Sequence, residues 1–306
     1  MNRRRIVLRA MLVLLASLAV LVWYALFTGP RVPDKARFAI DIQALRAAAG
    51  PDESLPVEAR SERVAQARMP AMVVMAGAGF GKLTFGFYVW QFVYADGSTA
   101  VLDAVHSLAM HKANGFDEAD YDRAAWDHQE KAVAAARIMA VTHEHYDHLG
   151  GFSESSHFAE LGPRLKLTET QRRPPRMGGI GRTLGGTPNL ESGPEGSLHV
   201  IGPGLVAISA PGHTPGSQLI YARLKNGREL LLIGDVVWQN FVLEHAGNRP
   251  RILTWIGAED GVAVAQEIRA VLDLAKANPS LDVVVAHDVA AMEARFASGA
   301  VHRTLR

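Results

Sequence analysis

Three histidines and one aspartate crowd into six consecutive positions of this chain: His143, His145, Asp147 and His148. Such a cluster of polar, ionisable side chains is unfavourable in a hydrophobic core, and clustering them on a surface also has a cost. Because side chains on a strand alternate between two faces, His148 would point away from the other three, so the segment is better read as the end of a strand that continues into a loop. In a loop, neutral imidazoles and a carboxylate can converge on zinc, iron or manganese. A polar loop that is merely rich in histidine is the alternative.

Three further potential ligands follow downstream, each at or just after an apolar, strand-like run. They are His213 in the segment 210–217, Asp235 after Leu232 and Ile233, and His287 after the run 283–286. The order and context of these residues resemble the metallo-β-lactamase superfamily over roughly residues 72–288. All seven ligand positions of the superfamily are filled in this chain.

The resemblance implies two divalent metal ions held side by side, zinc first, with iron or manganese as alternatives. It implies that His143, His145 and His213 bind the first ion, that Asp147, His148 and His287 bind the second, and that Asp235 bridges them. The zinc β-lactamases lack an aspartate at the bridging position. The pattern therefore resembles the hydrolases related to glyoxalase II, the N-acyl-homoserine lactonases and the metal-dependent phosphodiesterases.

The fold implied by the resemblance is α/β (α+β), a four-layer αββα sandwich with the site at the strand ends between the sheets. The sequence pattern agrees with such an alternation of elements. Strands are expected near 84–94, 100–103, 137–141, 198–201, 205–209, 218–224, 229–233 and 282–286, and helices near 117–136 and 261–277. We assign 71–306 to the hydrolase domain and 29–70 to a linker and N-terminal extension that contains a short helix and a loop.

Residues 1–28 form an N-terminal signal anchor in this interpretation. The eighteen residues Ala10–Phe27 are almost wholly apolar, and as a helix they span about 27 Å, close to the thickness of a bilayer's hydrocarbon core. Four arginines precede them, which predicts a cytoplasmic N-terminus and an exported domain, on the periplasmic side of a bacterial inner membrane. A cleaved signal peptide and a secreted or periplasmic protein are the alternative, and Arg4–Arg9 also resembles a weak twin-arginine export signal.

Composition excludes some classes of function. The chain of 306 residues has no cysteine, so disulfides and thiolate catalysis are excluded and every metal ligand must offer nitrogen or oxygen. The formal net charge is +1, and it becomes −3 without the four N-terminal arginines. A weakly acidic domain gives no electrostatic reason to expect nucleic acid as a partner. The expected partners are a small-molecule substrate and, through residues 1–28, the membrane. The oligomeric state is left open.

The expected mechanism uses a hydroxide shared by the two ions as the nucleophile. Asp235 and Asp147 are the catalytic carboxylates, the first as the bridge and the second as a group that can receive or relay a proton. Asp103 and Asp288 are candidates to orient metal-binding histidines through their second ring nitrogen. Trp238 stands where the resembled lactonases carry a tyrosine, and an indole can donate a hydrogen bond but cannot transfer a proton.

Three functions remain open at this point. The first is hydrolysis of a carboxylic ester, lactone or thioester. The second is a phosphodiesterase-type activity, favoured by arginines in the long segment 170–197: Arg172, Arg173, Arg176 and Arg182. The third is a membrane-anchored metal-binding protein without catalysis. Two other expectations are more local: His106 and His111 are read as surface histidines, and the glycine-rich segment 77–82 as a turn, since it lacks the residues of a phosphate-binding loop.

Overall fold

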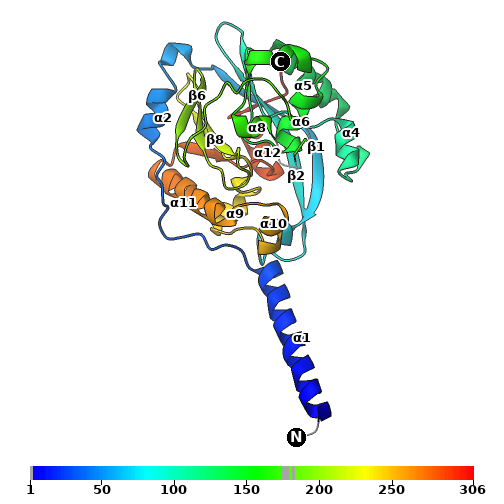
Figure 1. Ribbon diagram of the computed structural model, residues 1–306. Helices are drawn as coiled ribbons and strands as arrows, with labels where there is room; N and C mark the ends of the chain where they lie inside the picture. Colours follow the sequence, from blue (N-terminus) through cyan, green and yellow to red (C-terminus); the bar gives the residue numbers. More distant parts are fainter. Residues whose placement is uncertain (1–2, 174–178, 181–182) are drawn as a thin grey trace.

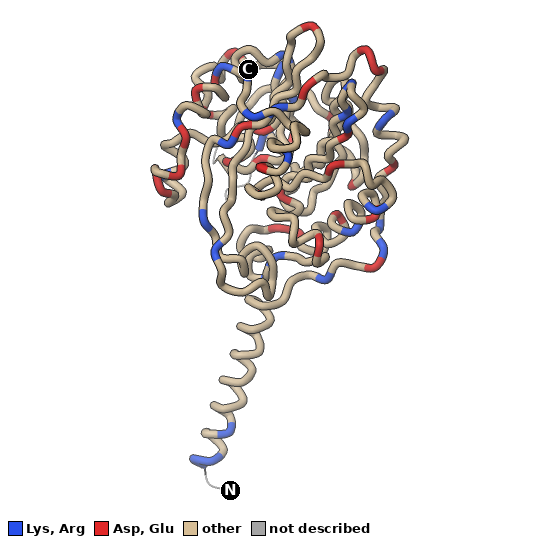
Figure 2. The backbone as a smooth tube through the Cα atoms, turned by 180° about the vertical axis from the view of Figure 1, so that it is seen from behind, with Lys and Arg blue, Asp and Glu red and all other residues tan. Residues whose placement is uncertain are grey.

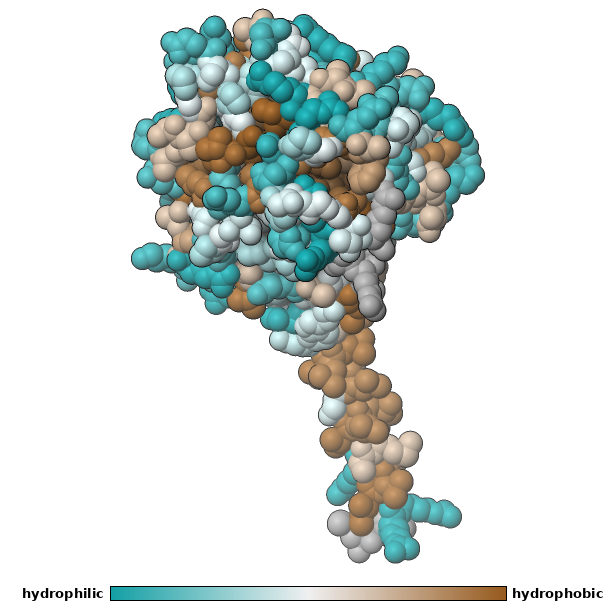
Figure 3. Space-filling model, turned by 45° about the horizontal axis from the view of Figure 1, so that its top comes forward, coloured by the Kyte–Doolittle hydropathy of each residue, from teal (hydrophilic) through white to brown (hydrophobic). Residues whose placement is uncertain are grey.

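A domain with one projecting helix makes up the molecule. The computed structural model describes residues 3–173, 179–180 and 183–306. Helix α1 (Arg3–Phe27) extends away from the domain (Figure 1), and none of its residues is buried. Within the described residues it is the one helix long and apolar enough to cross a membrane, with a mean hydropathy of 2.5. Figure 3 shows its surface as almost continuously hydrophobic, with hydrophilic side chains at its N-terminal end.

Two β-sheets form the centre of the domain. The first has the order β11 (His302–Arg303), β1 (Glu58–Pro70), β2 (Lys82–Val93), β3 (Thr99–Leu102), β4 (Ile138–Ala140) and β5 (Leu165–Lys166). The second has the order β10 (Leu281–Val284), β9 (Glu229–Leu232), β8 (Gln218–Arg223), β7 (Leu205–Ser209) and β6 (Leu198–Gly202). The strands expected between residues 84 and 286 are therefore confirmed.

Strand β1 corrects the expected start of the folded domain. Residues 29–70 are expected outside the hydrolase domain, but Glu58–Pro70 pairs antiparallel with β2, from Glu58 opposite Val93 to Pro70 opposite Lys82. Its buried positions are filled mainly by alanine, and charged residues occupy many of the others, so its alternation is weak in the sequence. The expected short helix before it is confirmed as α2 (Ile42–Ala48).

The two sheets pack face to face through one set of alternating side chains. From the first sheet this set includes Trp90, Phe92 and Leu102, and from the second Ile220 and Leu232. All are buried, which is the pattern of a sheet-on-sheet core. The core between the sheets fixes where their strand ends meet, and the candidate site lies at those ends.

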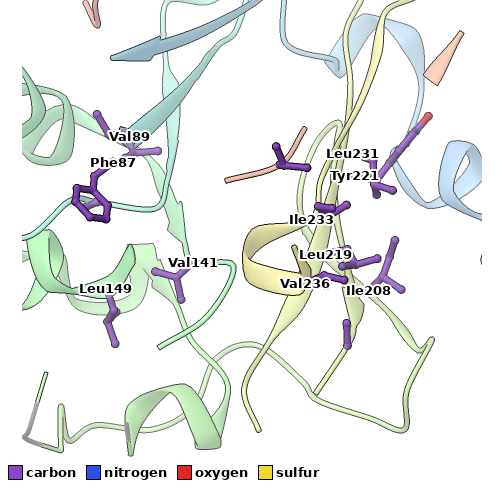
Figure 4. Packing of buried hydrophobic residues seen from close by; sticks show 14 of the residues in the cluster. Phe87, Val89, Val141, Leu149, Ile208, Leu219, Tyr221, Leu231, Ile233 and Val236 are labelled. Carbon is purple, nitrogen blue, oxygen red and sulfur yellow. The ribbon is translucent and has the colours of Figure 1, made fainter. Parts of the chain in front are cut away.

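Helices cover the two outer faces and complete the αββα layers. On the first sheet, Phe87 belongs to the face covered by α5 (Arg123–Ala135) and α6 (Tyr146–Glu154). On the second sheet, Leu219 and Tyr221 belong to the face covered by α11 (Gly261–Ala277). Figure 4 shows these side chains as two groups on separate sheets. The remaining helices are α3 (Ala71–Val74), α4 (Leu108–Ala113), α7 (Phe158–Leu161), α8 (Glu169–Arg172), α9 (Asn240–Glu244), α10 (Arg251–Ile256) and α12 (Val289–Ala297), with 3₁₀ turns at Asp52–Ser54, Glu118–Asp120, Gly162–Arg164 and Gly234–Val236.

Aspartates begin three of the helices that border the site. Asp122 caps α5, Asp260 caps α11 and Asp288 caps α12, each by accepting backbone N–H groups of the first turn. Such caps satisfy donors that have no partner inside the helix and fix where the helix starts. The predicted helix 261–277 is confirmed at both ends, and the Asp260 cap fixes its start.

Candidate metal centre

The histidine-rich motif lies where β4 gives way to α6. The strand ends at Ala140, His143 lies in the short connection, and α6 starts at Tyr146 with His145 at its N-cap position. Asp147 and His148 therefore occupy the first turn of a helix, where both side chains can turn back towards the strand end. The expected strand end followed by a connection is confirmed, but the second half of the motif, from Tyr146 onward, is helical and not a loop.

One group of ligand atoms comprises His143, His145, His213 and Asp235, and all of them lie within 4.8 Å of one another. The Oδ2 atom of Asp235 is 3.7 Å from Nε2 of His143 and 3.4 Å from Nε2 of His213. His213 Nε2 is also 3.0 Å from His145 Nδ1. The four side chains therefore converge on one small volume, as the sequence predicts for the first ion.

The second group comprises Asp147, His148, Asp235 and His287, again within 4.8 Å. Here the other oxygen of Asp235 takes part, because Oδ1 is 3.4 Å from His148 Nε2 and 3.0 Å from His287 Nε2. Asp147 Oδ2 is 3.6 Å from each of the same two nitrogens. Asp235 thus directs one carboxylate oxygen to each group, and the structure brings all seven predicted ligands together.

The donor atoms are suited to hold cations. His143 Nε2 and His148 Nε2 are buried and have no hydrogen-bond partner, an arrangement that costs free energy unless something else binds them. Burial lowers the pKa of His143 and His145 well below the usual value, so both rings are neutral and can donate a lone pair. Burial alone would raise the pKa of Asp235, but the surrounding histidines lower it well below the usual value. Neutral imidazole and ionised carboxylate are the ligand set of zinc and similar ions.

Asp103 orients His148, as expected. Its Oδ2 accepts from His148 Nδ1 at 2.9 Å, and its Oδ1 accepts the backbone N–H of Thr142 at 2.6 Å. Asp103 has a φ of 54°, an uncommon value for a residue with a side chain. Burial alone would lower the pKa of His148, but Asp103, Asp147 and Asp235 raise it well above the usual value. A divalent ion bound at Nε2 would replace the proton that these carboxylates favour.

Asp288 does not orient a histidine, and this expectation is wrong. It caps α12 through Ala291 N–H and accepts the backbone N–H of Asn240 at 3.0 Å. The Nδ1 atom of His287 instead lies 2.9 Å from the carbonyl oxygen of Gly86, on strand β2. A backbone carbonyl serves the purpose as well as a carboxylate does, and no side-chain pattern in the sequence reveals it.

Glu259 and Arg249 were missed by the sequence analysis. Glu259 Oε2 is 2.7 Å from His213 Nδ1 and accepts from Arg249 at 2.8 Å, and all three side chains are buried. Burial would raise the pKa of Glu259, but Arg249 lowers it below the usual value, so the carboxylate stays charged behind His213. Arg249 also donates to the backbone oxygen of Asp235. Nothing in the sequence around either residue marks this role.

Glu144 fastens the metal-binding loop to its neighbour. It is buried, and it accepts from the Thr214 hydroxyl at 2.8 Å and from the Gly216 N–H at 3.0 Å. A Cβ on Gly216 would meet the Glu144 carboxylate, so a larger residue there would displace this side chain and disturb its hydrogen bonds. The pair holds the loop of His143 and His145 against the loop of His213. The position of Glu144 inside the motif was the signal that could have found it.

Trp238 lies directly against the carboxylate of Asp235. Its indole N–H donates to Asp235 Oδ2 at 2.8 Å, and the guanidinium of Arg249 lies 4.2 Å from the centre of its ring system. The ring also contacts Phe85 edge-on at 5.5 Å. Trp238 therefore orients the Asp235 carboxylate, and its indole has no proton that it can transfer.

His106 and His111 are buried, so the expectation of surface histidines is wrong. His106 Nε2 lies 3.0 Å from His111 Nδ1, and His111 Nε2 lies 3.0 Å from the carbonyl oxygen of Asp117. The carbonyl can only accept, so His111 carries its proton on Nε2 and accepts from His106 through Nδ1. Aromatic rings, among them Phe87 and Tyr146, surround His106. The pair belongs to the core of the helical layer next to the metal centre.

The arginine-rich segment is described only in part. Arg176 and Arg182 lie outside the described residues. Arg172 donates to the carbonyl oxygen of Gly185 at 2.7 Å, and Arg173 pairs with Glu169 at 2.7 Å. Both described arginines are bound within their own segment, so they give no support to a phosphate-binding role.

Comparison with solved structures identifies the fold. An N-acyl homoserine lactone hydrolase with the product N-hexanoyl-L-homoserine at its catalytic metal centre aligns with a TM-score of 0.61 and 13% identity, over 78% of this chain and 96% of that one. An AiiA mutant from B. thuringiensis with N-decanoyl-L-homoserine bound gives 0.61 and 14%, over 78% and 96%. A probable metal-dependent hydrolase from Staphylococcus aureus gives 0.52 and 11%, over 77% and 90%.

The chain has the metallo-β-lactamase fold. No protein-family model matches the sequence, and no curated protein matches it either. At this level of identity the solved structures establish the metallo-β-lactamase fold alone, so what the chain does must be argued from its own residues. The position of the seven ligands at the strand ends between the two sheets is the starting point of that argument.

Proposed function

We propose that this protein is a dinuclear metal-dependent hydrolase that acts on a carboxylic ester, lactone or thioester. The observation that carries the proposal is the division of Asp235 between two ligand groups, with Oδ2 facing His143 and His213 and Oδ1 facing His148 and His287. A single mononuclear site would need only one of these oxygens. A scaffold without catalysis would have no use for a carboxylate held between two sets of buried histidines.

The seven ligands would hold two divalent ions, zinc or alternatively iron or manganese. When bound, such ions lower the pKa of a shared water from its bulk value towards about 7 and polarise the oxygen of the bond that is cleaved. The chain's residues then have two tasks, to hold the ions and to transfer a proton. They hold the ions through rings whose tautomers Asp103, Glu259 and the Gly86 carbonyl fix.

Asp147 is the residue that we assign to proton transfer. Burial raises its pKa, and its Oδ2 faces His148 and His287 without a short hydrogen bond. A carboxyl group with a raised pKa can accept a proton and pass it to a leaving oxygen or sulfur. Trp238 cannot take this task, because its one N–H is already directed at Asp235. In this respect the chain differs from the lactonases that it resembles, which carry a tyrosine at that position.

Acyl substrates are favoured over phosphate esters. Two of the solved structures with the same fold are described with N-acyl homoserine compounds bound, one of them a hydrolysis product at the metal centre. Arg172 and Arg173, the two described arginines of the segment 170–197, bind Gly185 and Glu169, so they give no support to an anion site. We therefore place lactones and thioesters ahead of phosphodiesters.

The test is hydrolysis by the full chain supplied with zinc or manganese, followed by proton release from lactones, esters and thioesters. We expect turnover that EDTA abolishes, and we expect Asp235→Ala to lose it while the bound metal, measured by elemental analysis, falls from two ions per chain. His128→Ala is a matched control, since His128 is a half-exposed histidine paired with Glu62. Full turnover by Asp235→Ala would exclude the dinuclear mechanism.

We propose in addition that α1 anchors the protein in a membrane. Its 25 residues exceed the length needed to span the hydrocarbon core, and Arg3, Arg4, Arg5 and Arg9 lie at its N-terminal end. This places the N-terminus in the cytoplasm and the hydrolase domain on the exported side of a bacterial inner membrane. A reporter that is active only after export, fused after Arg306, is expected to be active. Activity of a reporter that works only in the cytoplasm would reverse the orientation.

A further inference from the structure

Helix α1 is joined to one particular face of the domain. Arg251, the first residue of α10, lies 4.6 Å from the ring centre of Tyr24 and donates its backbone N–H to Thr28 at 3.0 Å. A Cβ on Gly29 would lie 2.6 Å from the carbonyl oxygen of Arg249, so the chain leaving α1 is packed tightly against the segment before α10. Figure 1 shows α10 at the end of the domain from which α1 projects. The contacts fix which face of the domain would look towards a membrane.

Exposed apolar side chains gather on this face. Beyond α1, the described large hydrophobic residues that are exposed are Phe80, Val200, Trp255, Ile256 and Val262. Trp255 and Ile256 belong to α10 and are more than half exposed. Val262 follows Gly261, whose Cβ would lie 2.7 Å from Pro30, just after α1. Four of the five therefore lie at the anchored end, and Val200, on β6, lies elsewhere.

Phe80 reaches the same face from another part of the chain. It is 73% exposed at the tip of the connection between β1 and β2. That connection is tied to the segment before α10, because the Ala76 N–H donates to the Asn248 carbonyl at 2.9 Å. Exposing an aromatic side chain to water on a glycine-rich turn is unfavourable, and moving it into a lipid interface would lower the free energy. The face therefore presents two aromatic rings and an isoleucine from two separate segments, helix α10 and the connection between β1 and β2.

Basic residues flank the apolar ones. Arg68 and Lys82, at the ends of β1 and β2, and Arg31, just after α1, are all exposed. Figure 2 shows Lys and Arg positions on both sides of the base of the domain, where α1 joins it. Apolar side chains bordered by lysine and arginine are the composition of a surface that lies in the headgroup region of an anionic bilayer. Contact with a second copy of the chain would not explain why these apolar and basic residues surround the base of a membrane-spanning helix.

The metal centre lies close to this face. The backbone of Arg249 touches Gly29, while its side chain binds Glu259 and the backbone oxygen of Asp235. One residue thus separates the bridging aspartate from the point where the anchor meets the domain. The anchored face and the candidate centre are therefore linked through one buried side chain.

We propose that Phe80, Trp255 and Ile256 insert into the interface of the bilayer that α1 crosses, and that the centre takes amphiphilic acyl substrates from that bilayer. The first half rests on the proposed membrane anchor, and the second rests on the proposed hydrolase function. The partner of this face is a lipid surface, not another protein chain.

The absence of cysteine makes a direct test simple. Single cysteines are introduced as Phe80→Cys and Ile256→Cys, with Val200→Cys as an equally exposed apolar control and Leu18→Cys as a control inside α1. Each full-length variant is labelled with an environment-sensitive fluorophore and reconstituted into vesicles of phosphatidylcholine and phosphatidylglycerol. We expect doxyl-labelled lipid to quench the probes at 18, 80 and 256 strongly, and iodide in the water to quench the probe at 200.

Each outcome of the quenching experiment decides a separate point. If 80 and 256 behave like 200, the proposed contact with lipid is overturned. If they are protected from iodide but are not quenched by lipid, a second copy of the chain covers the face, and the proposal is equally overturned. If the probe at 18 is not quenched by lipid, the membrane anchor itself fails, which is a different result.

The substrate half is tested with the double variant Phe80→Asp/Ile256→Asp against Val200→Asp. In vesicles, we expect the double variant to raise KM several-fold for N-dodecanoyl homoserine lactone, which partitions into lipid, and to leave kcat and the constants for N-butanoyl homoserine lactone unchanged. An equal loss on both substrates, or no loss on either, overturns delivery from the membrane. If the unmodified chain hydrolyses neither lactone, the proposed acyl hydrolase function has failed, and the quenching result stands separately.

Discussion

Two neighbouring regions of this domain bury histidines, and they use them in opposite ways. In the connection and first turn of α6, His143 and His148 have buried ring nitrogens without a hydrogen-bond partner, and the Asp235 carboxylate lies within 4 Å of both. In the segment before α5, His106 and His111 bond to each other and to the carbonyl of Asp117. The Nδ1 atom of His106 is also buried without a hydrogen-bond partner, so the difference between the two regions lies in the carboxylates. No carboxylate is within salt-bridge distance of either of these two rings among the described residues.

The difference shows that burial of histidine does not by itself make a metal site. What distinguishes the metal-binding loop is the set of carboxylates, Asp147 and Asp235 facing the rings and Asp103 and Glu259 behind them. These charges make it favourable for the loop to hold a cation. His106 packs against aromatic rings and another histidine, and burial, followed by the neighbouring His111, lowers its pKa to about 3, so it stays neutral.

Exchanging one histidine in each region should give the largest contrast. We expect His148→Ala to lose at least about 100-fold in kcat together with bound metal, because a direct ligand is removed where loss of an outer partner alone costs 10–100-fold. We expect His111→Ala to keep its metal and its kcat but to lower the free energy of unfolding by about 2 kcal/mol through a cavity and an unpaired His106. Elemental analysis and urea denaturation separate the two effects. Metal loss in His111→Ala would show that the two regions are one site.

Removing a carboxylate that lies behind a ligand should have an intermediate effect. Glu259→Gln keeps a hydrogen-bond acceptor for His213 but takes away the charge that pairs with Arg249, so we expect metal affinity to fall by about 10–100-fold. Asp288→Asn is the matched control. It lies beside the ligand His287 but caps α12, and it should cost only the cap, about 1 kcal/mol of stability or less.

Competition with a chelating dye measures the affinity in both variants. Equal affinity in Glu259→Gln and the unmodified chain would mean that Glu259 is a structural ion-pair partner of Arg249 and has no part in metal binding. Weaker binding in Asp288→Asn would restore the role that the sequence suggested for Asp288.

The sequence predicts the centre better than it predicts the support of the centre. The seven ligands are recognisable because each follows an apolar strand-like run, and the end of a buried strand has few directions in which to point. Glu259 lies in a turn between two helices, and Gly86 contributes a backbone atom, so neither leaves a pattern. Their roles depend on which segments meet in space, and local sequence periodicity carries no information about such tertiary contacts.

The same limit explains the errors in the fold. Strand β1 is long, but its buried positions are mostly alanine, and its pairing with β2 is a tertiary fact. His106 and His111 lie in a segment that looks polar, yet α4 and the 3₁₀ turn at Glu118–Asp120 fold it over so that both rings face the core. The prediction of helix α11 is confirmed because it rests on apolar spacing, which is a local signal. The Asp260 cap that the structure adds is a local signal as well.

The smallest expected effect concerns pH, and it tests whether the His106 pair is truly neutral. In the folded state the pKa of His106 is lowered to about 3, first by burial and then by the neighbouring His111, whereas the unfolded chain binds the proton near the ordinary value of 6.5. The unfolded state therefore holds more protons between these two values, so stability is intact above pH 6.5 and falls as the pH drops towards 3. The expected slope is up to about 1.4 kcal/mol per pH unit.

His106→Gln removes this titration while leaving an amide that can donate to His111. Both proteins are unfolded with urea between pH 5 and pH 7.5 in the presence of EDTA, so that loss of metal from the ligands at low pH affects neither comparison. We expect the stability of the unmodified chain to fall more steeply with decreasing pH than that of the variant, by roughly one proton per molecule. Parallel curves would show that His106 is charged in the folded chain, which would require a counter-charge close to its ring.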